Sequence, residues 1–486
     1  MSTLIIKQDK MRLRLYLILS GLLLVATVSH AKVRLPAIFS DNMVLQQQTR
    51  AAVWGKAAPG KKVTVKGSWG KSARAEAGAD STWLVRLETP AAGGPYTLTI
   101  SDGQPLTLNN VLVGEVWLCS GQSNMEMPMR GYGRQPVEGA LDAMLAAEPS
   151  FPLRVARLPR QASMERKWDC RVDGWNLNEP DAISRTSATA YYFGRILCER
   201  LHIPVGLIVS SWGGTAIEPW MSEECLTSLG YSLSDRQKNY SAKKESAPTV
   251  LYNAMLAPLA PFTVKGFIWY QGESNRPGND PEFPYSRLQT AFGKMLRDNF
   301  GDGSDKQPFY FVEIAPYNYS DAEALEAAYL REQQARTLDL LPNSGMVVTN
   351  DIGNPVVIHP AQKPEVGRRL ALLAFKRDYG LLGELDFSYP VYDSVKFEGS
   401  KATLTFKTGP GGLAPLNQDI AGFEVAGSDR VFYPATARVG DWFNVELTCE
   451  QVSEIVAVRY CFRNYKVGTL TNVFGLPARP FRTDNW

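Results

Sequence analysis

The segment 111–127 reads VLVGEVWLCSGQSNMEM, and it decides the fold class of this chain. Its first part, residues 111–119, is a nearly unbroken apolar run, which is typical of a strand buried on both faces of a parallel sheet. The run ends in Ser120 and Gly121, and small residues of this kind favour a turn. The segment therefore predicts a buried strand followed by a tight strand-to-helix turn, which is how a βαβ unit begins.

Further segments of the same kind follow along the chain. Four more apolar runs have the length of buried strands, and they cover residues 204–212, 264–270, 309–314 and 345–350. Apolar residues at helical spacing predict helices between them, over residues 186–202, 324–341 and 365–379. Since strands and helices alternate, we predict an α/β domain with a parallel sheet over residues 111–386.

Both flanks of this domain read as β-rich. Residues 32–110 contain short alternating runs, such as KVTVK at 62–66, and Pro59-Gly60 is one of the turns between them. Alternation returns after residue 387, for example in ATLTF at 402–406, and helical periods fade. We expect an N-terminal β-domain over 32–110 and a C-terminal β-region over 387–486.

Residues 1–31 have the pattern of a secretory signal peptide. Basic residues that include Arg12 and Arg14 precede an apolar run over 15–28, and small residues stand at positions 29 and 31. Because the run is too short to cross a bilayer comfortably, cleavage fits better than a membrane anchor. We therefore expect an exported protein, periplasmic or secreted, that begins at Lys32 and has no membrane span after cleavage.

The composition excludes several classes of protein. Hydrophobic residues make up 44% and charged residues 21%, so the chain is an ordinary folded protein. The net charge of +3, without a dense stripe of Lys or Arg, gives no reason to expect nucleic acid as a partner. Since no cysteine pair has zinc spacing, we expect neither a metal nor another cofactor.

Export permits disulfides among the six cysteines, but their pairing stays open. Cys449 and Cys461 could join neighbouring strands, whereas Cys119 lies in an apolar run and reads as a buried free thiol. The oligomeric state is open as well.

Polar residues gather where the predicted strands end. The carboxyl ends of parallel strands meet at one edge of the sheet, where ligands bind. Ser123 follows the first strand, Gly213 and Gly214 follow the second, and a turn from Gln271 to Asn275 follows the third. A hydroxyl nucleophile, closely approaching backbone amides and side-chain amides are the groups that acyl transfer requires. The sequence thus predicts an acyl-transfer site with Ser123 as its nucleophile.

The general base follows by elimination, because the chain has only three histidines. His30 lies in the signal segment, and His202 ends a predicted helix at the opposite edge of the sheet. His359 lies beyond the fifth strand, directly before Pro360. This position suits a helix start at the edge of the sheet where Ser123 is expected. We therefore predict that His359 is the base.

Four segments carry a family resemblance: LCSGQSNMEM at 118–127, SWGGTAIEPW at 211–220, GFIWYQGESN at 266–275, and His359-Pro360 with Lys363. In this order they resemble the sialate O-acetylesterases, a branch of the SGNH hydrolases. The terminal segment 475–484, GLPARPFRTD, resembles that family too. The resemblance implies a flavodoxin-like catalytic domain, which agrees with the absence of a G-x-S-x-G elbow at Ser123.

The resemblance also implies an acetyl ester on a sugar as the substrate. Acetylated sialic acid is the first expectation, and acetylxylan or another acetylated polysaccharide is the runner-up. A non-catalytic carbohydrate-binding surface protein is the remote alternative, although such a protein does not need these turns at separate strand ends.

Carried onto these residues, the resemblance implies that Ser123 is the nucleophile and His359 the base. The oxyanion hole takes the backbone amides of Ser123 and Gly214. Gln271 or Asn275 adds a side-chain donor, and the sequence leaves open which of the two does so.

The third member of the site departs from the usual SGNH pattern. That pattern has an aspartate three residues before the histidine, where this chain has Val356. Asp351 is the nearest acid upstream, and it could either orient His359 or cap a turn. We therefore predict a dyad of Ser123 and His359, with Asp351 as an uncertain helper and a rate that rises with pH as His359 deprotonates.

Overall fold

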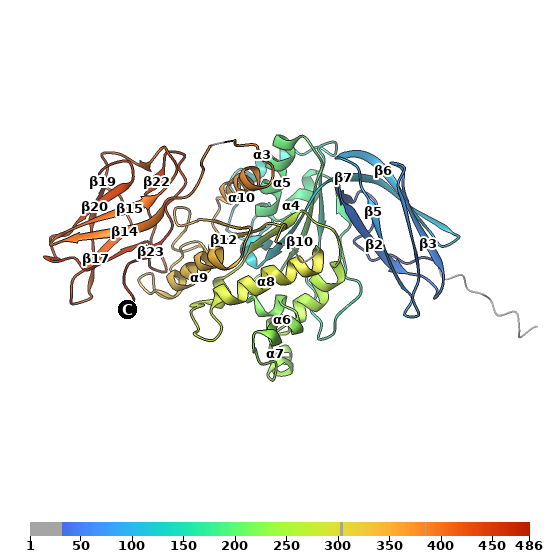
Figure 1. Ribbon diagram of the computed structural model, residues 1–486, viewed down its shortest axis with the longest axis horizontal. Coiled ribbons are helices and arrows are strands. Elements are labelled where there is room, and N and C mark those ends of the chain that lie inside the picture. The colour runs from blue at the N-terminus through green and yellow to red at the C-terminus, as the bar shows by residue number, and fades with distance from the viewer. Residues whose placement is uncertain (1–31, 302–304, 384) are drawn as a thin grey trace, which may run out of the picture.

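The computed structural model describes residues 32–301, 305–383 and 385–486 (Figure 1). The predicted signal peptide, residues 1–31, lies outside the described residues. Three parts follow one another along the longest axis of the molecule: a blue β-rich part, a central part in which helices cover a sheet, and an orange-to-red β-rich part. This succession is the one that the sequence predicts.

The central part is built on a parallel sheet. From one edge to the other its strands are β13 (Ser344–Val347), β12 (Phe309–Val312), β11 (Gly266–Tyr270), β7 (Pro105–Gly121), β10 (Val205–Ser211) and β8 (Leu153–Arg157). A short antiparallel strand, β9 (Trp175–Asn176), continues the sheet beyond β8. Without β8 and β9 the strands have the order 2-1-3-4-5 along the chain, which is the flavodoxin-like order. The predicted fold class is confirmed.

Helices cover both faces of this sheet (Figure 1). Strand β7 shows why two layers form, since Trp117 and Cys119 point into one core and Val116 and Leu118 into the other. On the first face lie α5 (Ala188–Leu201) and α10 (Lys363–Arg377), and on the second lie α8 (Tyr285–Phe300) and α9 (Glu326–Leu340).

The sequence analysis predicted α5, α9 and α10 but missed β8 and α8. Strand β8 has the sequence LRVAR, in which two of five residues are arginines, so it does not read as a buried strand. Arg154 is nevertheless buried, and its Nη1 donates to the carbonyl oxygen of Phe151 at 3.0 Å. Hydrogen bonds to carbonyl groups of the segment just before the strand therefore satisfy a buried arginine that the apolar pattern does not indicate.

Strand β7 also belongs to the N-terminal part. Its first half pairs with β6 (Gly93–Ser101), and its second half lies between β10 and β11. The predicted domain boundary at residue 110 falls inside this strand of 17 residues. The other N-terminal strands are β1 (Val44–Gln46), β2 (Arg50–Lys56), β3 (Lys62–Gly67), β4 (Ser72–Glu76) and β5 (Thr82–Glu88).

The C-terminal part contains two four-stranded antiparallel sheets. The first consists of β14 (Val391–Glu398), β15 (Lys401–Lys407), β20 (Asn444–Thr448) and β19 (Thr436–Val439). The second consists of β18 (Phe432–Pro434), β17 (Phe423–Ala426), β21 (Ala457–Tyr460) and β23 (Phe481–Arg482). It is joined to the central part by contacts such as the ion pair between Arg482 and Glu332 at 3.0 Å.

All six cysteines are free thiols. The alternative of a bridge between Cys449 and Cys461 does not occur, and Cys119 is a buried thiol, as its apolar context indicates. None of the helices in the described ranges combines the length and the apolarity that a membrane span needs.

Candidate active site

Ser123 stands at the turn that leaves the end of β7. Gly121 ends this strand with a φ of +146°, and a Cβ atom there would lie 2.2 Å from the carbonyl oxygen of Tyr270. Only glycine fits this close approach. The chain then enters the short helix α2 (Ser123–Glu126), which leaves Ser123 partly exposed at its start.

The glycine pair after β10 lies against this serine. A Cβ atom on Gly213 would lie 3.1 Å from the Cβ of Ser123. The amide of Gly213 is already used, because it donates to Glu126 Oε2 at 2.8 Å. The amide of Gly214, like that of Ser123, has no hydrogen-bond acceptor within the described ranges, and Gly214 takes a positive φ of +73°. This difference agrees with the choice of Gly214 as the oxyanion donor.

A loop that precedes helix α3 (Ala140–Leu145) contacts both His359 and the turn that holds Ser123. The ring of Tyr132 meets the imidazole edge to face at a centroid distance of 5.1 Å, and its hydroxyl donates to the carbonyl oxygen of Ser123 at 3.3 Å. Tyr132 thus contacts both residues of the predicted dyad. His202 is exposed and ends α5 at the far edge of the sheet, as predicted.

Gln135 is the hydrogen-bond partner of the imidazole. His359 Nδ1 lies 2.6 Å from Gln135 Oε1, so the Nδ1–H group donates to the amide oxygen. In that tautomer Nε2 carries a free lone pair and can accept a proton. The sequence analysis missed Gln135, because it belongs to a polar loop 224 positions away from His359 and to none of the four family segments.

A buried network joins the two halves of the site. Asn124 follows the serine, and its Nδ2 donates to Glu273 Oε1 at 2.6 Å and to the carbonyl oxygen of Ile358 at 3.2 Å. Lys363 donates from Nζ to Asn124 Oδ1 at 2.6 Å. Since Ile358 precedes His359, the residue after Ser123 is hydrogen-bonded directly to the residue before His359.

This network also sets the charge around the imidazole. Burial lowers the pKa of Lys363 to about 7, and Glu273 opposes that shift. Burial likewise raises the pKa of Glu273. The pKa of His359 falls to about 4, first through burial and second through the neighbouring Lys363 ammonium. The imidazole is therefore neutral at physiological pH.

The two predicted side-chain donors of the oxyanion hole are engaged elsewhere. Gln271 is fully buried, and its Nε2 has three acceptors, of which Asn275 Oδ1 at 2.8 Å is the nearest. Asn275 Nδ2 faces the carboxylate of Glu218 at 3.1 and 3.2 Å. Gln271 Nε2 has more acceptors than N–H groups and must give up one of them to bind an oxyanion, and the Asn275 amide is directed to Glu218, so the role of both stays a prediction.

Asp351 takes part in a buried ion pair. Its two oxygens accept from Arg369 at 2.8 and 2.6 Å, and Arg369 is almost completely buried. The hydrogen bond that orients His359 is the one that its Nδ1–H group donates to Gln135 Oε1. The structure therefore favours a stabilising role for Asp351, and its predicted help in catalysis stays untested.

A groove of about 380 Å³ opens beside the site and is lined by Tyr132 and Glu126. Its lining also includes four guanidinium groups, those of Arg130, Arg157, Arg160 and Arg185. Three of them are paired with carboxylates, namely Glu126, Asp173 and Asp181.

The fourth of these groups differs from the other three. The Arg130 side chain is exposed and has no ion-pair or hydrogen-bond partner in the part of the chain that the structure describes. The groove thus offers one unpaired positive charge next to the Ser123 turn. Such a charge suits a substrate that carries an anionic group.

Comparison with known proteins identifies the family of the chain. Residues 113–376 match the family model described as carbohydrate esterase, sialic acid-specific acetylesterase. The chain belongs to this esterase family. The sialate O-acetylesterase of Homo sapiens is 31% identical and is aligned over 76% of each chain. That of Mus musculus is 29% identical over 95% of this chain and 96% of its own length.

A solved structure extends the similarity to the whole fold. A carbohydrate acetylesterase from Xanthomonas citri is 36% identical, with a TM-score of 0.83, over 93% of this chain and 100% of its own. Membership of this esterase family confirms the predicted family and the predicted class of enzyme, and it argues against the non-catalytic alternative.

The lowered pKa of His359 leads to a prediction for the pH dependence. A base works only when it is deprotonated, so kcat/KM for an aryl acetate should rise with pH through a value of about 4 and be level above pH of about 6. Initial rates between pH 3.5 and 8, with circular dichroism at each pH to check the fold, measure this limb. A limb centred at or above the usual histidine pKa of about 6.5 would contradict it.

Proposed function

We propose that the protein is a serine esterase that removes O-acetyl groups from sialic acids. Ser123 Oγ attacks the acetyl carbonyl carbon while His359 Nε2 takes the hydroxyl proton. The tetrahedral intermediate then expels the sugar oxygen, which receives that proton from His359. Water attacks the acetyl-Ser123 ester in the same way and releases acetate.

The oxyanion of each intermediate is held by backbone amides in this proposal. The amides of Ser123 and Gly214 belong to adjacent turns and have no other acceptor within the described ranges. Donors that are already in place stabilise developing charge without having to reorganise. The hydrogen-bond partner of His359 Nδ1 is the amide of Gln135, which fixes the tautomer but carries no net charge to oppose the positive charge on the imidazolium.

The groove beside Ser123, with its unpaired Arg130, supports an acidic sugar over a neutral polysaccharide as the substrate. Sialic acid carries a carboxylate, and a guanidinium binds a carboxylate through two parallel hydrogen bonds. Acetylxylan carries no such group along its backbone, so Arg130 would contribute little to its binding. The curated relatives from Homo sapiens and Mus musculus are sialate O-acetylesterases, which supports the same choice.

Side-by-side release of acetate from acetylated sialic acids and from acetylxylan tests this proposal. We expect faster release from the sialic acids. Arg130→Gln should raise KM for them by about tenfold, the loss expected for one charge-assisted hydrogen bond, with little change for an aryl acetate. Arg200→Gln, an exposed arginine at the opposite edge of the sheet, is the matched control. Faster hydrolysis of acetylxylan would favour the polysaccharide alternative instead.

We also propose that the enzyme acts outside the cytoplasm. The signal-like pattern of residues 1–31 supports export to the periplasm or the medium. The N-terminal residue of the protein recovered from producing cells tests this, and we expect Lys32. An intact N-terminus in the cytosolic fraction would contradict it.

A further inference from the structure

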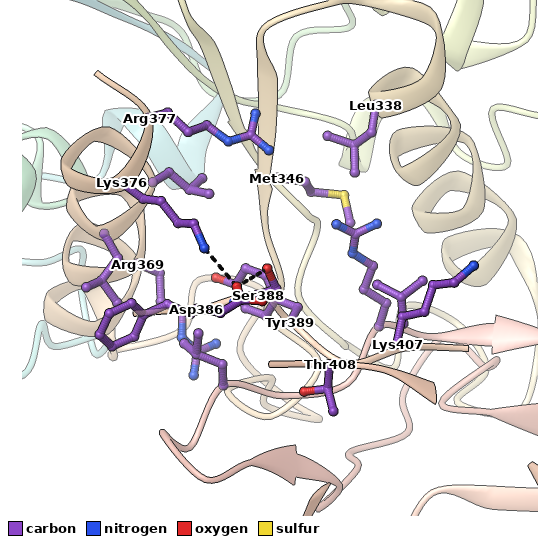
Figure 2. A pocket seen from close by; sticks show the side chains of 16 residues that line it. Leu338, Met346, Arg369, Lys376, Arg377, Asp386, Ser388, Tyr389, Lys407 and Thr408 are labelled. Atoms are coloured by element: carbon purple, nitrogen blue, oxygen red, sulfur yellow. Dashed lines mark hydrogen bonds and ion pairs between the residues drawn. The ribbon is translucent and has the colours of Figure 1, made fainter. Parts of the chain in front are cut away.

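A second cleft lies between helix α10 and the C-terminal β-region (Figure 2). It has a volume of about 400 Å³. The helix contributes Lys376 and Arg377, and the C-terminal region contributes Lys407 and Thr408 from the facing side. None of its lining residues also lines the groove beside Ser123, so the two clefts are separate.

The lining of this cleft is strongly basic. It holds one carboxylate, Asp386, and five basic side chains, which are Arg369, Lys376, Arg377, Lys407 and Arg479. Three of the five are paired with carboxylates: Lys376 with Asp386, Lys407 with Asp393, and Arg369 with Asp351 and Glu365. Arg377 and Arg479 have no carboxylate at ion-pair distance in the described ranges.

Arg479 is the more unusual of the two, and it lies in the terminal segment 475–484 that resembles the esterase family. Its Nε is buried and has no acceptor within the described ranges, and the hydroxyl of Thr408 is orphaned in the same way. Burial lowers the pKa of Arg479, and the buried Glu313 opposes this shift. A buried guanidinium nitrogen without an acceptor is unfavourable unless a ligand or water supplies one.

Arg377 completes the donor set at the rim of the cleft. It is exposed, and its Nη1 donates to the carbonyl oxygen of Ser344, which leaves its other nitrogens for a ligand. The lining also includes apolar side chains such as Leu338, Met346 and Leu476. Two guanidinium groups in a cleft that also has apolar lining suit a small molecule with one anionic group and one less polar face.

We propose that this cleft binds an acidic sugar through its carboxylate or phosphate group, with Arg377 and Arg479 as the donors. The site is separate from catalysis, and the proposal stands whether or not Ser123 acts on sialic acid. Free phosphate shares the same chemistry, so the experiment must distinguish the two sources.

Isothermal titration calorimetry at low ionic strength, with glucuronate, inorganic phosphate and glucose as probes, tests this proposal. We expect saturable binding of glucuronate, which becomes one-to-one in Arg130→Gln, and no binding of glucose. Arg377→Gln should weaken the affinity for glucuronate by about tenfold, as expected for one charge-assisted hydrogen bond. Arg479→Lys, which keeps the charge but loses the planar fork, should weaken it as well.

Control variants distinguish binding at this cleft from binding at the groove beside Ser123. Arg200→Gln should bind glucuronate as the parent does, binding at the second cleft should persist in Arg130→Gln, and Arg377→Gln should keep the parent kcat/KM for an aryl acetate. Because Arg377 is exposed, its variant is informative even if Arg479→Lys does not fold. The proposal is overturned if only phosphate binds, if nothing binds, or if binding depends on Arg130 and not on Arg377.

Discussion

Replacing Ser123 with alanine should lower kcat for acetyl esters by on the order of 10⁶-fold, and His359→Ala should lower it by a similar factor. The two residues act as one unit, because the alcohol is a poor nucleophile until a base removes its proton. Losing either one therefore leaves only the contribution of binding and of the oxyanion hole. Initial rates with an aryl acetate, measured together with circular dichroism, give the result.

The chain offers a matched control for each substitution. Ser274→Ala changes an exposed serine in the neighbouring turn, and His202→Ala changes the exposed histidine at the far edge of the sheet. Both should keep nearly full activity. A sulfonyl fluoride should label Ser123 in an intact-mass measurement, and a chelator should leave the rate unchanged. Full activity in both Ser123→Ala and His359→Ala would refute the assignment.

Gln135→Leu should lower kcat by about 10²-fold, which is less than the roughly 10⁴-fold loss expected for a true triad aspartate. Without the amide oxygen, nothing holds the proton on Nδ1, so the imidazole populates the wrong tautomer and turns more freely. Gln135→Glu should recover activity and move the acidic limb of the pH profile upward, because a carboxylate beside Nδ1 favours the charged imidazole. A purely structural role for Gln135 would not move that limb.

Measurement of kcat for the variant Asp351→Asn tests the role of Asp351. Because its carboxylate is paired with Arg369, Asp351→Asn should reduce kcat by no more than about tenfold, far less than the roughly 10⁴-fold of a triad residue. It should instead cost about 1–3 kcal/mol of stability in urea unfolding, since the buried Arg369 loses a charged partner. A loss of 10⁴-fold with an intact fold would establish Asp351 as a triad member and refute the dyad.

Much of the fold is readable from local pattern. The apolar run that ends at Gly121 predicts a central strand, because a strand buried on both faces has no polar alternation. The same reasoning predicted β10, β11, β12 and β13, which share the sheet with β7. It missed β8, because two arginines interrupt its apolar pattern. In the structure Arg154 donates to nearby carbonyl oxygens and Arg157 pairs with Asp173.

The candidate site divides in the same way. Ser123 and His359 could be predicted because each follows a strand at one edge of a parallel sheet, and because the chain has so few histidines. Residue type alone does not distinguish Gly214 from Gly213 as the backbone donor of the oxyanion hole. The structure gives a physical reason to prefer Gly214, because the Gly213 amide already donates to Glu126.

The sequence by itself determined the fold class, the nucleophile candidate and the base candidate, because these depend on residue type and on position along a strand. Only the tertiary structure decided what surrounds the base. Gln135 reaches His359 from a loop 224 positions away, and Arg369 holds Asp351 from a helix that begins after the histidine. Contacts between such distant segments leave no period or spacing in the chain, since they depend on how the helices and loops pack around the finished sheet.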